Sequence, residues 1–81
     1  MVTAFVLINV EDKNLSAISE TLLAQEGVQE VHVVAGEYDM IAVIRVEDNS
    51  TLSSLLTEHV IHTKGIVSTK TLISLQTSFS K

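Results

Sequence analysis

The chain has 81 residues, of which ten are acidic and five basic, so its formal net charge is −5, and it contains no cysteine. This length predicts one small domain, 1–81, whose core is thin unless subunits share it. The lack of cysteine excludes disulfides and thiolate metal sites and fits a cytoplasmic location. The basic residues are scattered, so direct nucleic-acid binding is not expected. No apolar run is long enough to span a membrane, so no membrane partner is expected either.

The first half of the chain reads as strand, helix, strand. The apolar run Val2–Val10 predicts the first strand. An amphipathic helix should follow, because apolar side chains recur on one helical stripe: Leu15, Ile18, Leu22 and Leu23. Asp12 or Asn14 is its candidate N-cap. Gly27 should end the turn after this helix by adopting a positive φ, and a second strand is expected over Gln29–Ala35.

The second half repeats this order, which makes the chain two β-α-β units. The strand Met40–Val46 precedes a second helical stripe: Leu52, Leu55, Leu56, His59 and Val60. Asn49 or Ser50 is the candidate N-cap, and Gly65 should lead into a last strand, Ile66–Leu75. Acidic pairs before each helix are expected to complement the positive helix ends: Glu11-Asp12 and Glu47-Asp48.

The polarity of the strands predicts their order in the sheet. The first and third strands are apolar on nearly both faces and belong in the centre, whereas the half-polar second and fourth suit the edges. Right-handed crossovers then give an antiparallel sheet of order 4-1-3-2 with both helices on one face. This is an α+β, ferredoxin-like βαββαβ sandwich. The other face should be too apolar for water, which predicts a sheet-on-sheet homodimer; it should carry Phe5, Leu7, Ile41 and Val43.

A hairpin between the second and third strands is the most informative local feature. If it turns on Gly36-Glu37-Tyr38-Asp39, then Val33 stands opposite Ala42 and Glu30 opposite Arg45. One face of the hairpin should then be helix-facing core, made of Val31, Val33, Ala35, Met40, Ala42 and Ile44. The tip is left as a candidate ligand site, where Asp39 either bonds its own backbone or contacts a ligand.

No enzyme motif is evident, and neither a cofactor nor a metal is expected. His59 and His62 could lie on one side of the second helix as metal ligands, but no third ligand is suggested, and stabilising the helix C-terminus is the alternative role. The alternative function is a small cofactor-free enzyme of the dimeric α+β barrel type. It would require a pocket inside the subunit that contains His32 or His59.

Three stretches carry a resemblance to a known family. The hairpin, read as Val34 to Val43, resembles the pattern V-x-G-x-Y-D followed by apolar alternation in the effector-binding domain of Lrp/AsnC (leucine-responsive, feast/famine) transcription regulators. The segments Glu26–Val31 and Gly65–Thr71 are similar to a helix-to-strand turn and to the last strand of that domain. The resemblance covers essentially the whole chain and keeps the order and spacing of these segments.

This resemblance implies a domain that dimerises through its sheets and assembles further, with an octamer as the expected ring. Small effectors, chiefly amino acids, would bind where dimers meet, at five positions that match the family: Gly36, Tyr38, Asp39, Thr69 and Thr71. The chain resembles the stand-alone version of the domain without a helix-turn-helix. It is therefore expected to act by assembling with full-length Lrp/AsnC regulators or by sensing the metabolite itself.

Overall fold

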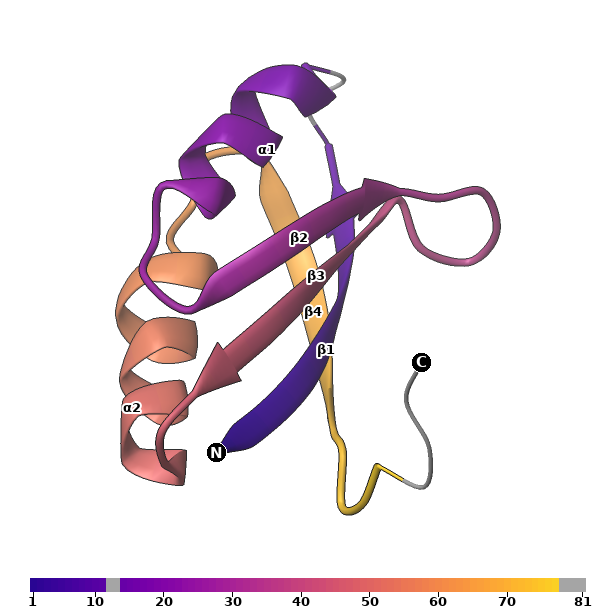
Figure 1. Cartoon of the computed structure of the whole chain (residues 1–81). Helices are drawn as coiled ribbons and strands as arrows, with labels where there is room; N and C mark the ends of the chain where they lie inside the picture. The colour runs from indigo at the N-terminus through magenta and orange to yellow at the C-terminus, as the bar shows by residue number, and fades with distance from the viewer. Residues whose placement is uncertain (12–13, 78–81) are drawn as a thin grey trace.

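The computed structural model describes residues 1–11 and 14–77 and shows one sheet covered on one face by helices (Figure 1). Its elements are β1 (Val2–Val10), α1 (Leu15–Leu23), β2 (Val28–Val33), β3 (Met40–Val46), α2 (Asn49–Ser54), the π-helical segment η1 (Leu55–Val60) and β4 (Ile66–Ile73). The antiparallel strands follow the order β2-β3-β1-β4, which confirms the predicted order and the ferredoxin-like α+β fold. No helix within the described residues is both long and apolar enough to cross a bilayer.

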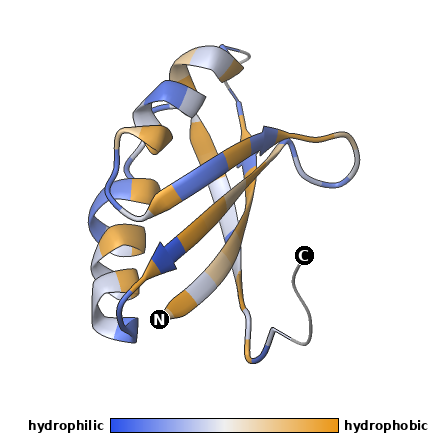
Figure 2. Cartoon of the chain, viewed as in Figure 1, coloured by the Kyte–Doolittle hydropathy of each residue, from blue (hydrophilic) through white to orange (hydrophobic). Residues whose placement is uncertain are grey.

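The strand polarity that predicted this order is visible in the sheet. Figure 2 shows β3 as apolar along most of its length, whereas the edge strand β2 carries a polar stretch. In the centre, Phe5 stands opposite Val43 on β3 and Leu7 opposite Ile41, so these four side chains share one face, as predicted. Leu72 on β4 extends this row, because it pairs with Phe5 on the other side. This open face is the one that the helices do not cover (Figure 1).

The core lies between the other face of the sheet and the helices. Every buried side chain among the described residues is apolar. The sheet contributes Val28 from β2 and the alternate residues of β1 and β3 that face the helices. These are Ala4, Val6 and Ile8 on β1, and Met40, Ala42, Ile44 and Val46 on β3. The helical layer contributes Ile18, Leu22, Leu52, Leu55 and Val60. The domain is therefore held together by one apolar layer.

Helix α1 begins and ends as its sequence indicates. The side chain of Asn14 accepts a hydrogen bond from the Ala17 N–H at 3.2 Å, which makes it the N-cap; Asp12, the other candidate, lies outside the described residues. After the helix, Gly27 adopts φ +101° and its carbonyl accepts the Arg45 N–H at 2.8 Å. A Cβ at Gly27 would lie 2.8 Å from Val46 Cγ1. Both the turn and its close contact with β3 therefore require glycine.

The substitution Gly27→Ala should lower the free energy of unfolding by about 2–3 kcal/mol, because it combines backbone strain with a steric clash. Gly36→Ala is the matched control, since Gly36 has φ +142° but nothing lies within 4 Å of the place that a Cβ would occupy. It should cost only about 1 kcal/mol. Urea denaturation at one protein concentration measures both. Equal losses for the two variants would contradict the role assigned to the Val46 contact.

The second helix begins one residue earlier than predicted. Its N-cap is Asp48, which has extended backbone geometry (φ −151°, ψ 171°) and accepts the Thr51 N–H at 2.7 Å, so the candidates Asn49 and Ser50 were wrong. The hydrogen bonds from the backbone and then from the side chain of Thr51 lower the pKa of the Asp48 carboxyl below its ordinary value of 3.8. The expectation that the acidic pair before this helix complements its N-terminus is confirmed at Asp48.

The second half of this helix is wound more widely than an α-helix. In η1 the Ile61 N–H donates to the Leu56 carbonyl, five residues earlier, at 3.1 Å. Such i→i+5 bonds place residues five apart on one side, so Leu55 and Val60 are both buried. The prediction that His59 belongs to the apolar stripe was wrong, because it assumed the 3.6-residue period; His59 is exposed.

The stability contributed by Asp48 should depend on pH. Because its pKa is lower in the folded protein, this contribution is present above the unfolded value of 3.8 and is lost as the pH falls through the lower folded value. Asp48→Ala should therefore lower the Tm at pH 7, and the difference from the unsubstituted chain should shrink well below pH 3.8. Asparagine is a neutral N-cap, so the Tm difference between Asp48→Asn and Asp48→Ala should not vary with pH. Thermal unfolding followed by circular dichroism measures all three, and a pH-independent Asp48→Ala difference would contradict the assignment.

Candidate functional site

The hairpin between β2 and β3 has a different register from the predicted one. Val33 stands opposite Met40 and Val31 opposite Ala42, whereas the prediction placed Val33 opposite Ala42. Strand alternation determines only which face a side chain occupies, so a shift of two residues preserves the faces and cannot be detected from the pattern. The connection accordingly runs from Val34 to Asp39, longer than the predicted turn. The tip is therefore a loop that projects away from the helices (Figure 1).

The predicted core face of the hairpin is correct on β3 and wrong at the end of β2. Met40, Ala42 and Ile44 are fully buried, and Val31 packs against the core as a partly buried residue. Val33, in contrast, is 59% exposed, and Ala35 is also exposed. The reason is that this end of β2 lies beyond the part of the sheet that the helices cover (Figure 1).

The predicted cross-strand pair of Glu30 and Arg45 does not form. Glu30 stands opposite Val43, and its Oε1 lies 2.8 Å from Nε2 of His32 on the same exposed edge. On the β2 side of β3, the Arg45 N–H donates to the Gly27 carbonyl at 2.8 Å. The two-residue shift explains why Glu30 stands opposite Val43 and not opposite Arg45.

Asp39 is bound to the neighbouring strand β1. Its N–H donates to the Ile8 carbonyl at 2.9 Å, and its Oδ2 accepts the Val10 N–H at 2.9 Å. Its own carbonyl accepts the Val34 N–H at 3.0 Å and so closes the base of the loop. Of the two roles considered for this side chain, the bond to its own loop is not observed; the carboxylate holds a strand far away in sequence.

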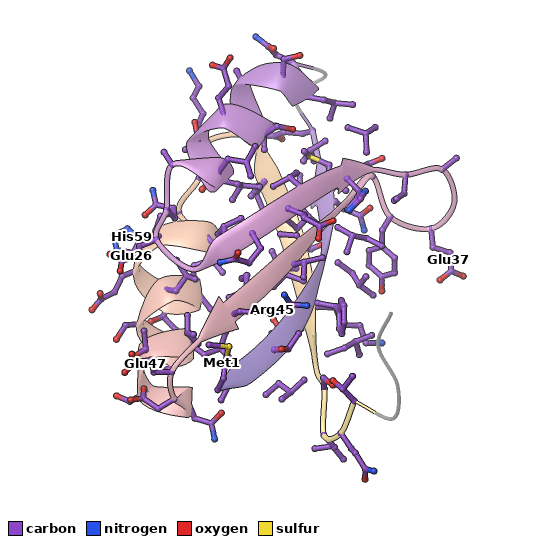
Figure 3. All side chains as sticks on the ribbon, viewed as in Figure 1. Met1, Glu26, Glu37, Arg45, Glu47 and His59 are labelled. Carbon is purple, nitrogen blue, oxygen red and sulfur yellow. The ribbon has the colours of Figure 1, made fainter. Side chains whose placement is uncertain are left out.

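Gly36 and Tyr38 lie in the loop itself. Gly36 has φ +142° and open space where a side chain would be, so other molecules can approach its backbone. Tyr38 is partly buried, while Glu37 between them is exposed and points away from the body of the domain (Figure 3). The tip therefore offers backbone groups and one aromatic side chain to a partner.

Thr69 and Thr71 lie on β4, on the other side of β1 from the hairpin. They stand opposite Ile8 and Val6, which are fully buried under the helices, so both threonines are on the helix side and are partly buried. Two strand spacings separate β4 from β3, which is roughly 10 Å. Within one chain, the five predicted site residues therefore form two groups, three at the hairpin tip and two on the far edge strand.

The sequence did not indicate a cavity at the opposite end of the sheet. A hollow of about 470 Å³ is lined there by Glu26, Glu47 and Thr51 among others, and an adjoining one of about 200 Å³ shares Glu26 and Thr51 and reaches His59. Figure 3 shows Glu26, Glu47 and His59 at this end, far from Glu37. Both hollows are lined mainly by exposed side chains from separate segments, and none of the five predicted site residues lines them.

The histidines give no support to a metal site or to an internal catalytic pocket. Among residues 1–11 and 14–77, no group of three or more histidine or acidic side chains is placed to hold a metal ion. His32, His59 and His62 are all exposed. The hollow that reaches His59 is lined mainly by exposed side chains, and every buried side chain of the described part is apolar, so the structure gives no support to the enzymatic alternative.

The fold and the site define a small α+β domain whose distinctive feature is a projecting hairpin beside an apolar sheet face. The model of the Lrp/AsnC ligand binding domain matches residues 3–81 of this chain. The chain therefore belongs to the Lrp/AsnC family, as the resemblance in the hairpin indicated. It is also 35% identical, over 78 residues, to an uncharacterized HTH-type transcriptional regulator of Pyrococcus furiosus, covering 93% of this chain and 52% of that protein. The chain thus spans about half the length of the curated relatives it matches.

Two solved structures show the same arrangement. TTHA0845 from Thermus thermophilus has a TM-score of 0.90 and 31% identity, with 99% of this chain and 100% of that chain covered. The feast or famine regulatory protein Rv3291c from M. tuberculosis, solved in complex with L-methionine, has a TM-score of 0.82 and 28% identity; 99% of this chain and 54% of that chain are covered. The first is a similarly short chain, and the second is a longer protein with an amino acid bound.

Proposed function

We propose that this chain is an amino-acid-binding and oligomer-forming regulatory module of the Lrp/AsnC type. It modulates transcription or metabolism by assembling with full-length regulators or by sensing the metabolite itself. The observation that carries this proposal is the match of residues 3–81 to a ligand binding domain, combined with the L-methionine complex of a relative that has the same fold. The chain acts as a binding module, with no catalytic step.

The open sheet face supports assembly. Five apolar side chains from three strands share it: Phe5, Leu7, Ile41, Val43 and Leu72. Phe5 is 38% and Leu72 49% exposed in the single chain. A contiguous apolar patch of this kind marks an interaction surface. In our proposal two copies cover this face by packing sheet against sheet, and the dimers assemble into a higher oligomer such as an octamer.

The proposed effector site combines the two groups of predicted residues across subunits. Asp39 uses Oδ2 for Val10, and in our proposal its Oδ1 accepts the ammonium of an amino acid, a charge-assisted bond worth roughly 1.5–3 kcal/mol. Gly36 lets backbone N–H groups approach the ligand carboxylate, and Tyr38 packs beside it. Thr69 and Thr71 of another subunit supply hydroxyl groups. The separation of the two groups within one chain supports a site where dimers meet.

At least one amino acid should stabilise the protein. In a thermal-shift screen with individual proteinogenic amino acids, an effector present at 100-fold excess over its Kd adds about 2.7 kcal/mol, which raises the Tm by on the order of 10 °C. Thr71→Val should reduce this shift because it removes the hydroxyl at nearly constant volume. Thr57→Val is the control, since Thr57 Oγ1 donates only to the Ser53 carbonyl of its own helix. A screen in which no amino acid changes the Tm would exclude the sensing role.

The substitution Phe5→Glu should prevent assembly, because it places a carboxylate in the centre of the apolar face. The matched control is Leu23→Glu, which changes an apolar residue that is 49% exposed on α1, away from this face. We expect Phe5→Glu to elute as a monomer in size-exclusion chromatography with light scattering, while Leu23→Glu keeps the oligomer of the unsubstituted chain. If both variants keep that oligomer, the open face is not the interface.

A further inference from the structure

Strand β1 extends further than the strand beside it. Its pairing with β3 ends at Ile8 and Met40, yet β1 continues to Val10, which still pairs with Ile66 of β4 on the other side. On the β3 side, the Val10 N–H therefore has no strand carbonyl to bond. A partly buried N–H needs an acceptor, and the acceptor is the carboxylate of Asp39.

Asp39 divides its three polar groups between strand β1 and the base of its own loop. In an antiparallel ladder, backbone N–H and carbonyl groups provide all the bonds to the neighbouring strand. Here the Asp39 N–H provides one bond to β1, and the carboxylate replaces the carbonyl that a longer β3 would have supplied. Its own carbonyl is free to bond Val34 across the loop. The loop before β3 can therefore lie outside the sheet while the Val10 N–H keeps a hydrogen-bond acceptor.

We propose that Asp39 is a positioning residue, whose bond to Val10 sets the direction in which the loop from Val34 to Tyr38 leaves the sheet. It thereby places Gly36 and Tyr38 for contact with the effector. This inference rests on the proposed function of the tip, but it assigns Asp39 a role that precedes any ligand. The bond is to a neutral amide N–H, so it needs an acceptor oxygen and no charge. An asparagine side chain meets that need, whereas the ammonium contact proposed for Oδ1 needs the charge.

The chain contains its own probe of loop order. Tyr38 is the only tyrosine of the chain, which has no tryptophan, so tyrosine fluorescence reports on the tip alone. Local motion of Tyr38 can be followed by fluorescence anisotropy decay, and the Val10–Asp39 bond by hydrogen exchange of the Val10 amide. Neither measurement requires a ligand.

The test compares Asp39→Asn, Asp39→Ala and the tip control Glu37→Ala. The Asn variant and the control should keep the slow Val10 exchange and the restricted Tyr38 motion of the unsubstituted chain. In Asp39→Ala, exchange at Val10 should accelerate roughly tenfold or more and Tyr38 should gain fast local motion. If the Ala variant fails to fold, Asp39→Ser, whose shorter side chain does not reach Val10, takes its place. An Asn variant as mobile as the Ala variant, or an Ala variant as ordered as the unsubstituted chain, overturns the proposal.

A ligand measurement separates this inference from the proposed function. The same variants are titrated with a mixture of the proteinogenic amino acids at millimolar concentration, and the Tm is recorded. We expect Asp39→Asn to lose part of the Tm shift and Asp39→Ala to lose all of it. If the unsubstituted chain shows no shift while Val10 and Tyr38 respond as described, the effector function fails and the positioning role stands. If Asp39→Asn and Asp39→Ala lose the Tm shift equally although the loop of Asp39→Asn is ordered, effector binding depends only on the charge of Asp39. Positioning of the loop then does not control binding.

Discussion

Strand β1 is the element on which the rest of the domain depends, because it pairs on both sides and is apolar on both faces. Toward the helices its side chains are fully buried at Ala4, Val6 and Ile8. Toward the open side Phe5 and Leu7 are also apolar. A strand without a polar face is stable only in the centre of a sheet, with both faces covered. The helices cover one face, and the assembly that we propose would cover the other.

The difference in length between β1 and β3 determines the shape of the candidate site. Because β3 starts opposite Ile8, the loop before it must leave the sheet while β1 continues. The side chain of Asp39 bridges this difference in length, and the tip projects away from the helices (Figure 1). Val33 at the end of β2 and Ala35 in the loop are exposed at this end of the hairpin. The difference in strand length thus shapes the candidate site.

Much of the fold could be predicted from local patterns. The strands, their order and the cap at Asn14 follow from polarity, from crossover handedness and from the capping preference of short polar side chains. The N-cap of α2 was predicted one residue too late, because the side chains of Asp48, Asn49 and Ser50 can all accept the capping hydrogen bond. The residue that caps the helix depends on where the helix begins. Val60 is buried as its place on the predicted stripe required, but the exposure of His59 was missed because the wider winding of η1 leaves no mark in the apolar spacing.

The sequence by itself determined which face of each strand is apolar, where positive φ angles occur, and which family the hairpin resembles. These properties depend on residues close together in the chain. Only the tertiary structure decided the hairpin register, the separation of Thr69 from the tip, and the partner of Asp39. Asp39 and Val10 are 29 residues apart, and their bond arises because β1 is longer than its neighbour. Alternation repeats every two residues, so it cannot distinguish registers that differ by two; the ends of the paired strands make that choice.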